Sequence, residues 1–223
     1  MYGNHYSPAT IPNIANLVGK DMQVFHNRSV KERYVVIYCD AAFVSVRRDS
    51  VQKEAMHTLI GVDEKGHKEV LDYGLYPSES KENYRSLLQS LKNRGLKDVL
   101  VFVSDGLTGL PDAVLEEFPS SKHQACRTHV SRNVMNRIRA KDKVEVGEYL
   151  RKVHQADNLE GAKEKYEAFR EKWKVKYSKV IYTLDRYDNL FTYLEFPKAI
   201  QRNLYTNNMI ENFNKRVKKN TQK

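Results

Sequence analysis

The stretch Tyr34-Val35-Val36-Ile37-Tyr38-Cys39-Asp40 decides the fold, because it is an unbroken β-branched and aromatic run that ends on a carboxylate. Such a run, preceded by the charged residues 29–33, predicts a strand buried on both faces. A second apolar run, residues 98–105, also ends on an aspartate. If the two strands lie side by side, Asp40 and Asp105 meet at one edge of a sheet.

The charge balance narrows the class of partner. Lysine and arginine outnumber aspartate and glutamate by 38 to 28, which gives a formal net charge of +10. This excess favours an anionic partner, and nucleic acid is the commonest one. Hydrophobic residues make up 40% of the 223 residues, which is enough for a sizeable core.

The sequence also bears on the compartment. Residues 1–10 are polar and lack the apolar segment of a signal peptide, and no apolar run approaches the length of a membrane span. Two cysteines, Cys39 and Cys126, lie beside apolar residues and do not indicate a disulfide framework. We therefore expect a cytoplasmic protein with no membrane partner.

The remaining patterns predict an ordered series of elements. In chain order they are a helix over 9–18, a linker over 20–33, the first strand from 34 to about 48, strands over 54–62 and 67–76 around a tight turn, a helix over 78–95, a strand over 99–104, a helix over 112–118 and a strand over 123–126. Three antiparallel strands followed by alternating helices and strands are the order of a ribonuclease H-like core, a mixed α/β sheet with flanking helices.

The character of the sequence changes after Thr128. Charged helical patterns dominate as far as residue 199, and strand patterns almost vanish. We read this part as an all-helical insertion, because the residues after it must still complete the site. The expected organisation is a leader with a linker (1–33), the core (34–127), the insertion (128–203) and a last helix that completes the core (204–223).

A third carboxylate, Glu211, lies in the last predicted helix. An asparagine, Asn207 or Asn208, can cap this helix, and Ile210 and Phe213 begin its buried face. Glu211 is therefore expected in the first turn of the helix, next to that buried face.

Three carboxylates at a sheet edge form the usual oxygen cage for Mg²⁺ or Mn²⁺. Two such ions can clamp an in-line phosphoryl displacement, one at the attacking oxygen and one at the leaving oxygen. Aspartates suit strand ends because their side chains are short, whereas a glutamate on a helix can reach further. The pattern of Asp40, Asp105 and Glu211 therefore favours metal-dependent phosphoryl transfer.

Four motifs in this order resemble the mutator-type transposases of bacterial insertion sequences. They are Asp40 after its strand, residues 103–111 (Val-Ser-Asp-Gly-Leu-Thr-Gly-Leu-Pro), residues 126–129 (Cys-Arg-Thr-His) and residues 205–211 (Tyr-Thr-Asn-Asn-Met-Ile-Glu). The resemblance implies a ribonuclease H-like catalytic domain with an Asp, Asp, Glu triad and a helical insertion before the glutamate. It assigns Asp40, Asp105 and Glu211 as the catalytic ligands of Mg²⁺ or Mn²⁺.

The resemblance also implies the reaction and the partners. The family nicks double-stranded DNA at the ends of its element, and the freed 3′-hydroxyl then attacks target DNA without a covalent protein–DNA intermediate. Its members commonly act as multimers on paired ends, so self-association and a place at the bacterial nucleoid are expected. Members usually carry an N-terminal DNA-binding region and continue past the glutamate helix, and we expect this chain to lack both.

Each carboxylate also has a purely structural explanation. Asp40 could cap a turn, and Asp105 begins a common Asp-Gly turn pair. Glu211 could close a capping box with Asn208 or pair with Lys215 at i,i+4. The matching context of the two aspartates favours metal binding for them, and only the family resemblance favours it for Glu211.

Cys126 and His129 have the spacing of a zinc-ligand pair. The chain offers only Cys39 and His123 as remote partners, so we predict a packing role at the root of the insertion, near the site. The single tryptophan, Trp173, is expected in a core, with stacking on a flipped base as the alternative.

Two groups of basic side chains flank the predicted site, and we predict that they contact DNA phosphates rather than only solvent. They are Lys215, Arg216, Lys218 and Lys219 after the glutamate, and Arg127 and Arg132 at the start of the insertion. Two other functions remain open: a metal-dependent nuclease or resolvase on the same fold, and an inactive DNA-binding remnant.

Overall fold

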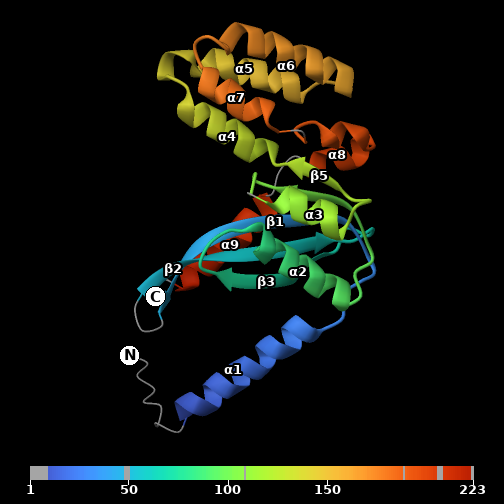
Figure 1. The fold of residues 1–223 in the computed structure, drawn as a ribbon, viewed down its shortest axis with the longest axis vertical. Coiled ribbons are helices and arrows are strands. Elements are labelled where there is room, and N and C mark those ends of the chain that lie inside the picture. The colour runs from blue at the N-terminus through green and yellow to red at the C-terminus, as the bar shows by residue number, and fades with distance from the viewer. Residues whose placement is uncertain (1–9, 48–50, 108, 188, 205–207, 222–223) are drawn as a thin grey trace.

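The computed structural model describes residues 10–47, 51–107, 109–187, 189–204 and 208–221. Within these ranges the strands form a five-stranded mixed sheet in the order β3-β2-β1-β4-β5 (Figure 1). The strands are β1 (Arg33–Arg47), β2 (Val51–Val62), β3 (Lys68–Tyr76), β4 (Asp98–Ser104) and β5 (Lys122–Ala125). The predicted order of three antiparallel strands followed by alternating helices and strands is confirmed.

The two apolar runs that end on aspartates lie side by side, as predicted. Strand β1 is antiparallel to β2 and parallel to β4, and Cys39 is the partner of Ser104 in the parallel ladder. Strand β4 ends there, whereas β1 continues to Arg47 in its pairing with β2. Asp40 and Asp105 therefore follow the last pair of this ladder, where β1 has lost its partner on one side.

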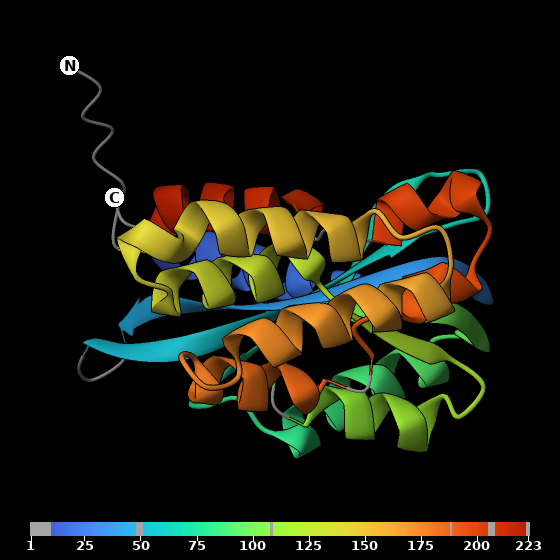
Figure 2. The ribbon, with the colours of Figure 1, turned by 90° about the horizontal axis from the view of Figure 1, so that it is seen from above.

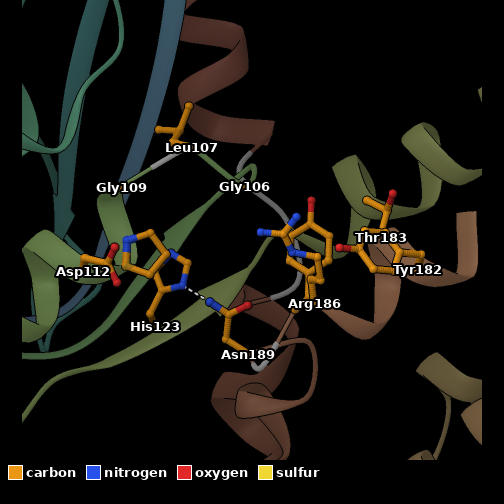
Figure 3. Close-up of a pocket in the computed structure, with 11 residues that line it drawn as sticks. Gly106, Leu107, Gly109, Asp112, His123, Tyr182, Thr183, Arg186 and Asn189 are labelled. Atoms are coloured by element: carbon orange, nitrogen blue, oxygen red, sulfur yellow. Dashed lines mark hydrogen bonds between the residues drawn. The ribbon is translucent and has the colours of Figure 1, made fainter. Parts of the chain in front are cut away.

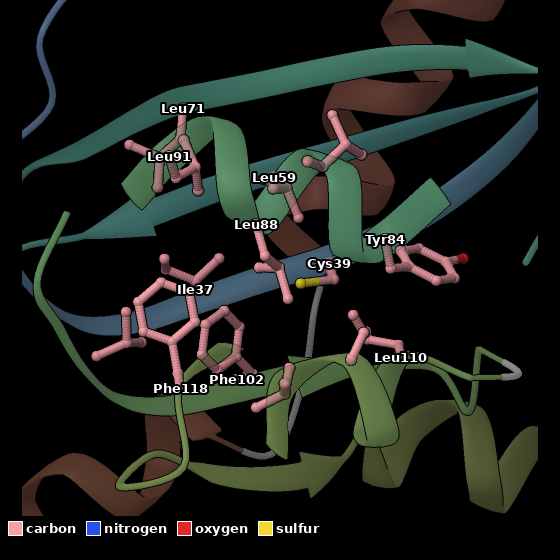
Figure 4. Packing of buried hydrophobic residues seen from close by; sticks show 14 of the residues in the cluster. Ile37, Cys39, Leu59, Leu71, Tyr84, Leu88, Leu91, Phe102, Leu110 and Phe118 are labelled. Atoms are coloured by element: carbon pink, nitrogen blue, oxygen red, sulfur yellow. The ribbon is translucent and has the colours of Figure 1, made fainter. Parts of the chain in front are cut away.

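One face of the sheet is covered by α2 (Lys81–Asn93) and α3 (Leu110–Glu117) (Figure 1). The side chain of Ser80 accepts a hydrogen bond from the backbone N–H of Asn83 and thereby caps α2. The apolar stripe of α2 then packs on the sheet and on α3 (Figure 4). The stripe consists of Tyr84, Leu87, Leu88 and Leu91.

The opposite face is covered by the end of the chain. Here lie η2 (Thr192–Glu195), α8 (Lys198–Leu204) and α9 (Asn208–Thr221), and Leu204 and Ile210 pack against Val36 and Tyr38 of β1. Successive side chains of a strand point to opposite faces, so Ile37 and Cys39 face α2 while Val36 and Tyr38 face the end of the chain. Asp40 belongs to the second set, which directs it toward the helix that carries Glu211.

A group of helices, which we call the insertion, lies beyond the β5 edge of the sheet (Figure 1) and in front of the strands in the view from above (Figure 2). It consists of α4 (Arg127–Arg137), η1 (Ala140–Asp142), α5 (Lys143–His154), α6 (Leu159–Trp173) and α7 (Ser178–Asp185). These helices enclose a hydrophobic core of their own, and Trp173 is buried in it with 4% of its surface exposed. Trp173 therefore packs in a core, and its alternative role in stacking is wrong.

The insertion is attached to the sheet through strand β5. The backbone N–H of Ala125 donates to the carbonyl of Asn189, and the buried side chain of Gln124 bonds both Leu190 and Tyr193. Cys39 and Cys126 are both buried, and neither is in a disulfide. Among the described helices, none combines the length and the apolar character needed to cross a bilayer.

The predicted linker over residues 20–33 is wrong in its first part, because α1 runs from Thr10 to Asn27. The polar residues in the second half of this helix had favoured an irregular segment. Tertiary contacts instead hold this end of the helix against β3, where the ring of Phe25 lies 5.5 Å from that of Tyr73. Helix α1 lies at the opposite end of the molecule from the insertion (Figure 1).

A buried ion pair fixes this end of the molecule. Asp72 of β3 is 2% exposed and lies 2.9 Å from the guanidinium of Arg94, which follows α2. Its carboxylate also accepts a hydrogen bond from Ser90 and lies 2.7 Å from the ring of His26 at the end of α1. One carboxylate thus joins β3, α1 and α2.

We expect Asp72→Ala to lower the free energy of unfolding by about 3 kcal/mol, because it leaves the buried Arg94 without its counter-charge. Urea denaturation measures this change. Glu32→Ala is the matched control, since it removes a carboxylate from an exposed pair with Lys97 and should change stability little. Equal effects of the two substitutions would contradict a structural role for the buried pair.

Candidate active site

The two aspartates that follow the parallel ladder are largely buried and differ in their hydrogen bonds. One oxygen of Asp40 accepts from the backbone N–H of Ala41 at 3.0 Å, and the other accepts from the side-chain amide of Asn214 at 2.8 Å. Oδ1 of Asp105 is buried, yet within the described part of the chain it accepts no hydrogen bond. A buried carboxylate oxygen without a donor carries a desolvation penalty that a bound cation would offset.

Burial and mutual repulsion act on both carboxyl groups. The pKa of Asp40 is raised to about 6, mainly by burial and in part by the charge of Glu211. Burial likewise raises the pKa of Asp105 to about 7, with added repulsion from Asp40 and Glu79. Several negative groups are therefore crowded together, which is the electrostatic condition that favours a cation.

Glu211 lies in the first turn of α9, as predicted, and α4 of the insertion holds its carboxylate. Its Oε1 lies 2.7 Å from Nε2 of His129 and 3.4 Å from the guanidinium of Arg132. Its Oε2 lies 4.0 Å from the ammonium of Lys215, so the i,i+4 pair is also present. Asn207 lies outside the described residues, as does the side chain of Asn208, so the predicted cap is not described.

The chemistry of the donors fits a hard divalent cation at the two aspartates. Carboxylate oxygens are the ligands that Mg²⁺ and Mn²⁺ prefer, and Asp105 has an oxygen without a donor. Among the described side chains, no three of the histidine, cysteine, aspartate and glutamate type converge closely enough to hold an ion. Glu211 would have to turn away from His129 to join Asp40 and Asp105.

Cys126 and His129 lie near the site but have different surroundings. Cys126 is fully buried in the core beneath α9, and its backbone N–H donates to the carbonyl of Ser104. His129 instead contacts Glu211, and burial lowers the pKa of its ring. The packing role predicted for both residues therefore describes Cys126, whereas His129 contacts a candidate catalytic side chain.

The basic residues fall into two groups. In the C-terminal group Lys215, Arg216 and Lys219 are exposed, and the charge of Lys218 reaches far enough to lower the pKa of Asp40. In the insertion, Arg132 pairs with Glu211. The guanidinium of Arg127 lies 5.0 Å from the centre of the Tyr193 ring.

Asn214 was not predicted as a site residue, yet it is 4% exposed and its side-chain amide donates to Asp40. The hydroxyl of Thr58, the β2 partner of Asp40, donates to Oδ1 of Asn214 at 3.3 Å. The available signal was the spacing of three residues between Glu211 and Asn214, which places both on adjacent positions of one helix face. Glu79 was missed as well, because no motif connects it to Asp105.

Comparison with known proteins decides the family. The sequence matches the family described as "Transposase, Mutator family" over residues 1–223. The chain belongs to the mutator family of transposases. This membership confirms the resemblance seen in the four motifs.

Relatives in this family come from several bacteria. The chain is 38% identical over 223 residues to the transposase for insertion sequence element IS905 of Lactococcus lactis, covering 100% of the chain and 57% of that relative. It is 37% identical over 220 residues to the transposase for IS1201 of Lactobacillus helveticus, covering 98% of the chain and 60% of the relative. The chain therefore spans somewhat more than half the length of these relatives.

A solved structure, the Drosophila P element transposase strand transfer complex, aligns with 52% of the chain and 32% of its own. The TM-score is 0.32 and the sequence identity is 15%.

The crowded carboxylates predict a pH-dependent loss of stability when no divalent ion is present. Because the folded-state pKa of Asp105 is raised to about 7, stability falls as the pH rises from the ordinary aspartate range toward and through that value. In EDTA at pH 8, we expect Asp105→Asn to raise the free energy of unfolding by about 2 kcal/mol. At pH 4.5 the two proteins should be nearly equal.

Thermal or urea denaturation at the two pH values measures this difference. Asp98→Asn is the matched control, since Asp98 lies exposed at the other end of β4 beside Arg33. If Asp105→Asn instead lowered the free energy of unfolding equally at both pH values, the ionised carboxylate of Asp105 would not be destabilising.

Proposed function

We propose that this chain forms the catalytic domain of an insertion-sequence transposase, which cleaves DNA strands and joins them to target DNA with a divalent metal ion. The observation that carries the proposal is the position of Asp40 and Asp105. They follow the last pair of a parallel ladder and share a buried, negatively charged environment. The charge of Glu211 on α9 contributes to the raised pKa of Asp40.

The arrangement of elements supports a ribonuclease H-like core. An antiparallel β3-β2-β1 unit continues into parallel β4 and β5, with helices on both faces. We assign residues 34–127 to this core, 128–203 to the insertion, 204–223 to the helix that completes the core, and 1–33 to a leader.

Each residue of the site has a distinct task in the proposed reaction. Asp40 and Asp105 would hold Mg²⁺ or Mn²⁺, with Glu211 as the third ligand. When bound, such ions activate the attacking oxygen and stabilise the leaving oxygen of the phosphodiester. Asn214 orients Asp40 by donating to one of its oxygens, and it thereby fixes α9 against β1.

Double-stranded DNA is the proposed partner, as the element ends and as the target. Lys215, Arg216 and Lys219 expose positive charge on the helix that carries Glu211 and would bind backbone phosphates. The named relatives are transposases for insertion sequences, and the chain covers 57% and 60% of the first two. Complete transposition, self-association on paired ends and action at the bacterial nucleoid are parts of this proposal.

We expect Asp40→Asn to abolish Mg²⁺- or Mn²⁺-dependent nicking and joining of labelled DNA that carries the element's own ends. The loss should be roughly 100-fold or more, because the substitution removes a ligand of the metal ion that would stabilise charge at the reacting phosphate. DNA binding in EDTA should persist. Glu211→Gln should behave like Asp40→Asn, and the exposed control Asp98→Asn should retain activity.

The outcomes separate the proposed function from its rivals. Unchanged nicking by Asp40→Asn would contradict the site. Nicking without joining would identify a nuclease or resolvase. DNA binding without any nicking by the unsubstituted chain would identify a DNA-binding module.

A further inference from the structure

A cavity of about 580 Å³ opens directly beside the candidate active site. It begins at Gly106, the residue after Asp105. Tyr187 lies in its wall, and burial together with the charge of Asp105 raises the pKa of this side chain. The volume lies within the range of roughly 300–1,000 Å³ that is usual for sites that bind small organic groups. The proposed reaction at Asp40, Asp105 and Glu211 gives this cavity no role.

Two parts of the molecule form the cavity together. The core contributes Gly106 and His123, and α7 with the turn after it contributes Tyr182, Arg186 and Tyr187 (Figure 3). A Cβ atom at Gly106 would lie 2.8 Å from the hydroxyl of Tyr187, so a side chain here would collide with the insertion. The loop after β4 and the insertion are thus in close contact at the edge of the cavity.

One wall of the cavity offers a free hydrogen-bond acceptor. The amide nitrogen of Asn189 donates to Nδ1 of His123 (Figure 3). Nε2 of the same ring lies 2.9 Å from the hydroxyl of Ser104. Burial lowers the pKa of His123 to about 4, so the ring is neutral near pH 7. Oδ1 of Asn189 is buried and, among the described residues, has no partner. A ligand with an N–H group would satisfy this oxygen.

The rim of the cavity combines an aromatic ring with a positive charge. The side chain of Tyr182 is 64% exposed, and the guanidinium of Arg186 lies 5.8 Å from the centre of its ring. Arg186 is exposed, and within the described part of the chain it has no ion-pair partner. Exposed aromatic rings stack on nucleic-acid bases, and guanidinium groups bind phosphates.

We propose that this cavity receives an unstacked nucleotide of the DNA strand that is bound at the active site, an inference that rests on the proposed function. The base enters between the insertion and the core and stacks on Tyr182. An N–H group of the base donates to Oδ1 of Asn189, and Arg186 contacts the adjoining phosphate. Exocyclic amines such as those of adenine and cytosine supply such a donor.

The test measures binding of two DNA duplexes to the full chain in EDTA, where no cleavage occurs. One duplex is fully paired, and the other has the same sequence with one extrahelical 2-aminopurine. We expect the bulged duplex to bind about tenfold more tightly, the factor given by about 1.4 kcal/mol of base stacking. The fluorescence of 2-aminopurine should fall on binding as the base stacks.

Two substitutions at exposed positions locate the effect without endangering the fold. Tyr182→Ala and Arg186→Ala should each remove most of the preference for the bulged duplex. Arg151→Ala is the matched control for Arg186→Ala, since Arg151 is an exposed arginine of the insertion outside this cavity. It should weaken binding of both duplexes equally and leave the preference intact.

Equal binding of the two duplexes by the unsubstituted chain would overturn the inference and leave the proposed function standing. A preference that survives in both Tyr182→Ala and Arg186→Ala would overturn the assignment to this cavity. Binding of neither duplex would overturn the inference and the proposed function together.

Discussion

The parallel pairing of β1 with β4 is the constraint on which the rest of the structure depends. It ends at Cys39 and Ser104, and the next residue of each strand is an aspartate. A shift of the register by one residue would turn Asp40 toward α2 and place a hydrophobic side chain against α9. Both faces of the sheet are packed with apolar side chains, so the register and the position of the two carboxylates are fixed together.

The candidate site lowers the stability of the fold, as catalytic sites often do. Asp40 and Asp105 are buried and repel each other, which a fold selected only for stability would avoid. Neighbouring groups offset part of this penalty, since Asn214 donates to Asp40 and His129 contacts Glu211. The same contacts join β1, α9 and α4, so the core and the insertion meet at the candidate catalytic groups.

Periodic local patterns made much of the fold predictable. The apolar run that forms β1 and the apolar stripe of α2 could each be predicted from the sequence, because their buried residues recur at the spacing of a strand or a helix. The end of α1 was not predictable, since contacts with β3 rather than local propensity hold its last turn. Asn214 was missed for a similar reason: it bonds Asp40 across 174 residues, and no local pattern records such a contact.

We propose that Asp40 and Asp105 bind a divalent cation in the folded chain. Anomalous diffraction from crystals of the full chain grown with Mn²⁺ tests this most directly, because it locates the metal without requiring activity. We expect an anomalous peak between the two carboxylates, with Glu211 turned from His129 toward it. A well-ordered site without such a peak at saturating Mn²⁺, or a peak held by other residues, would show that the two aspartates are not metal ligands.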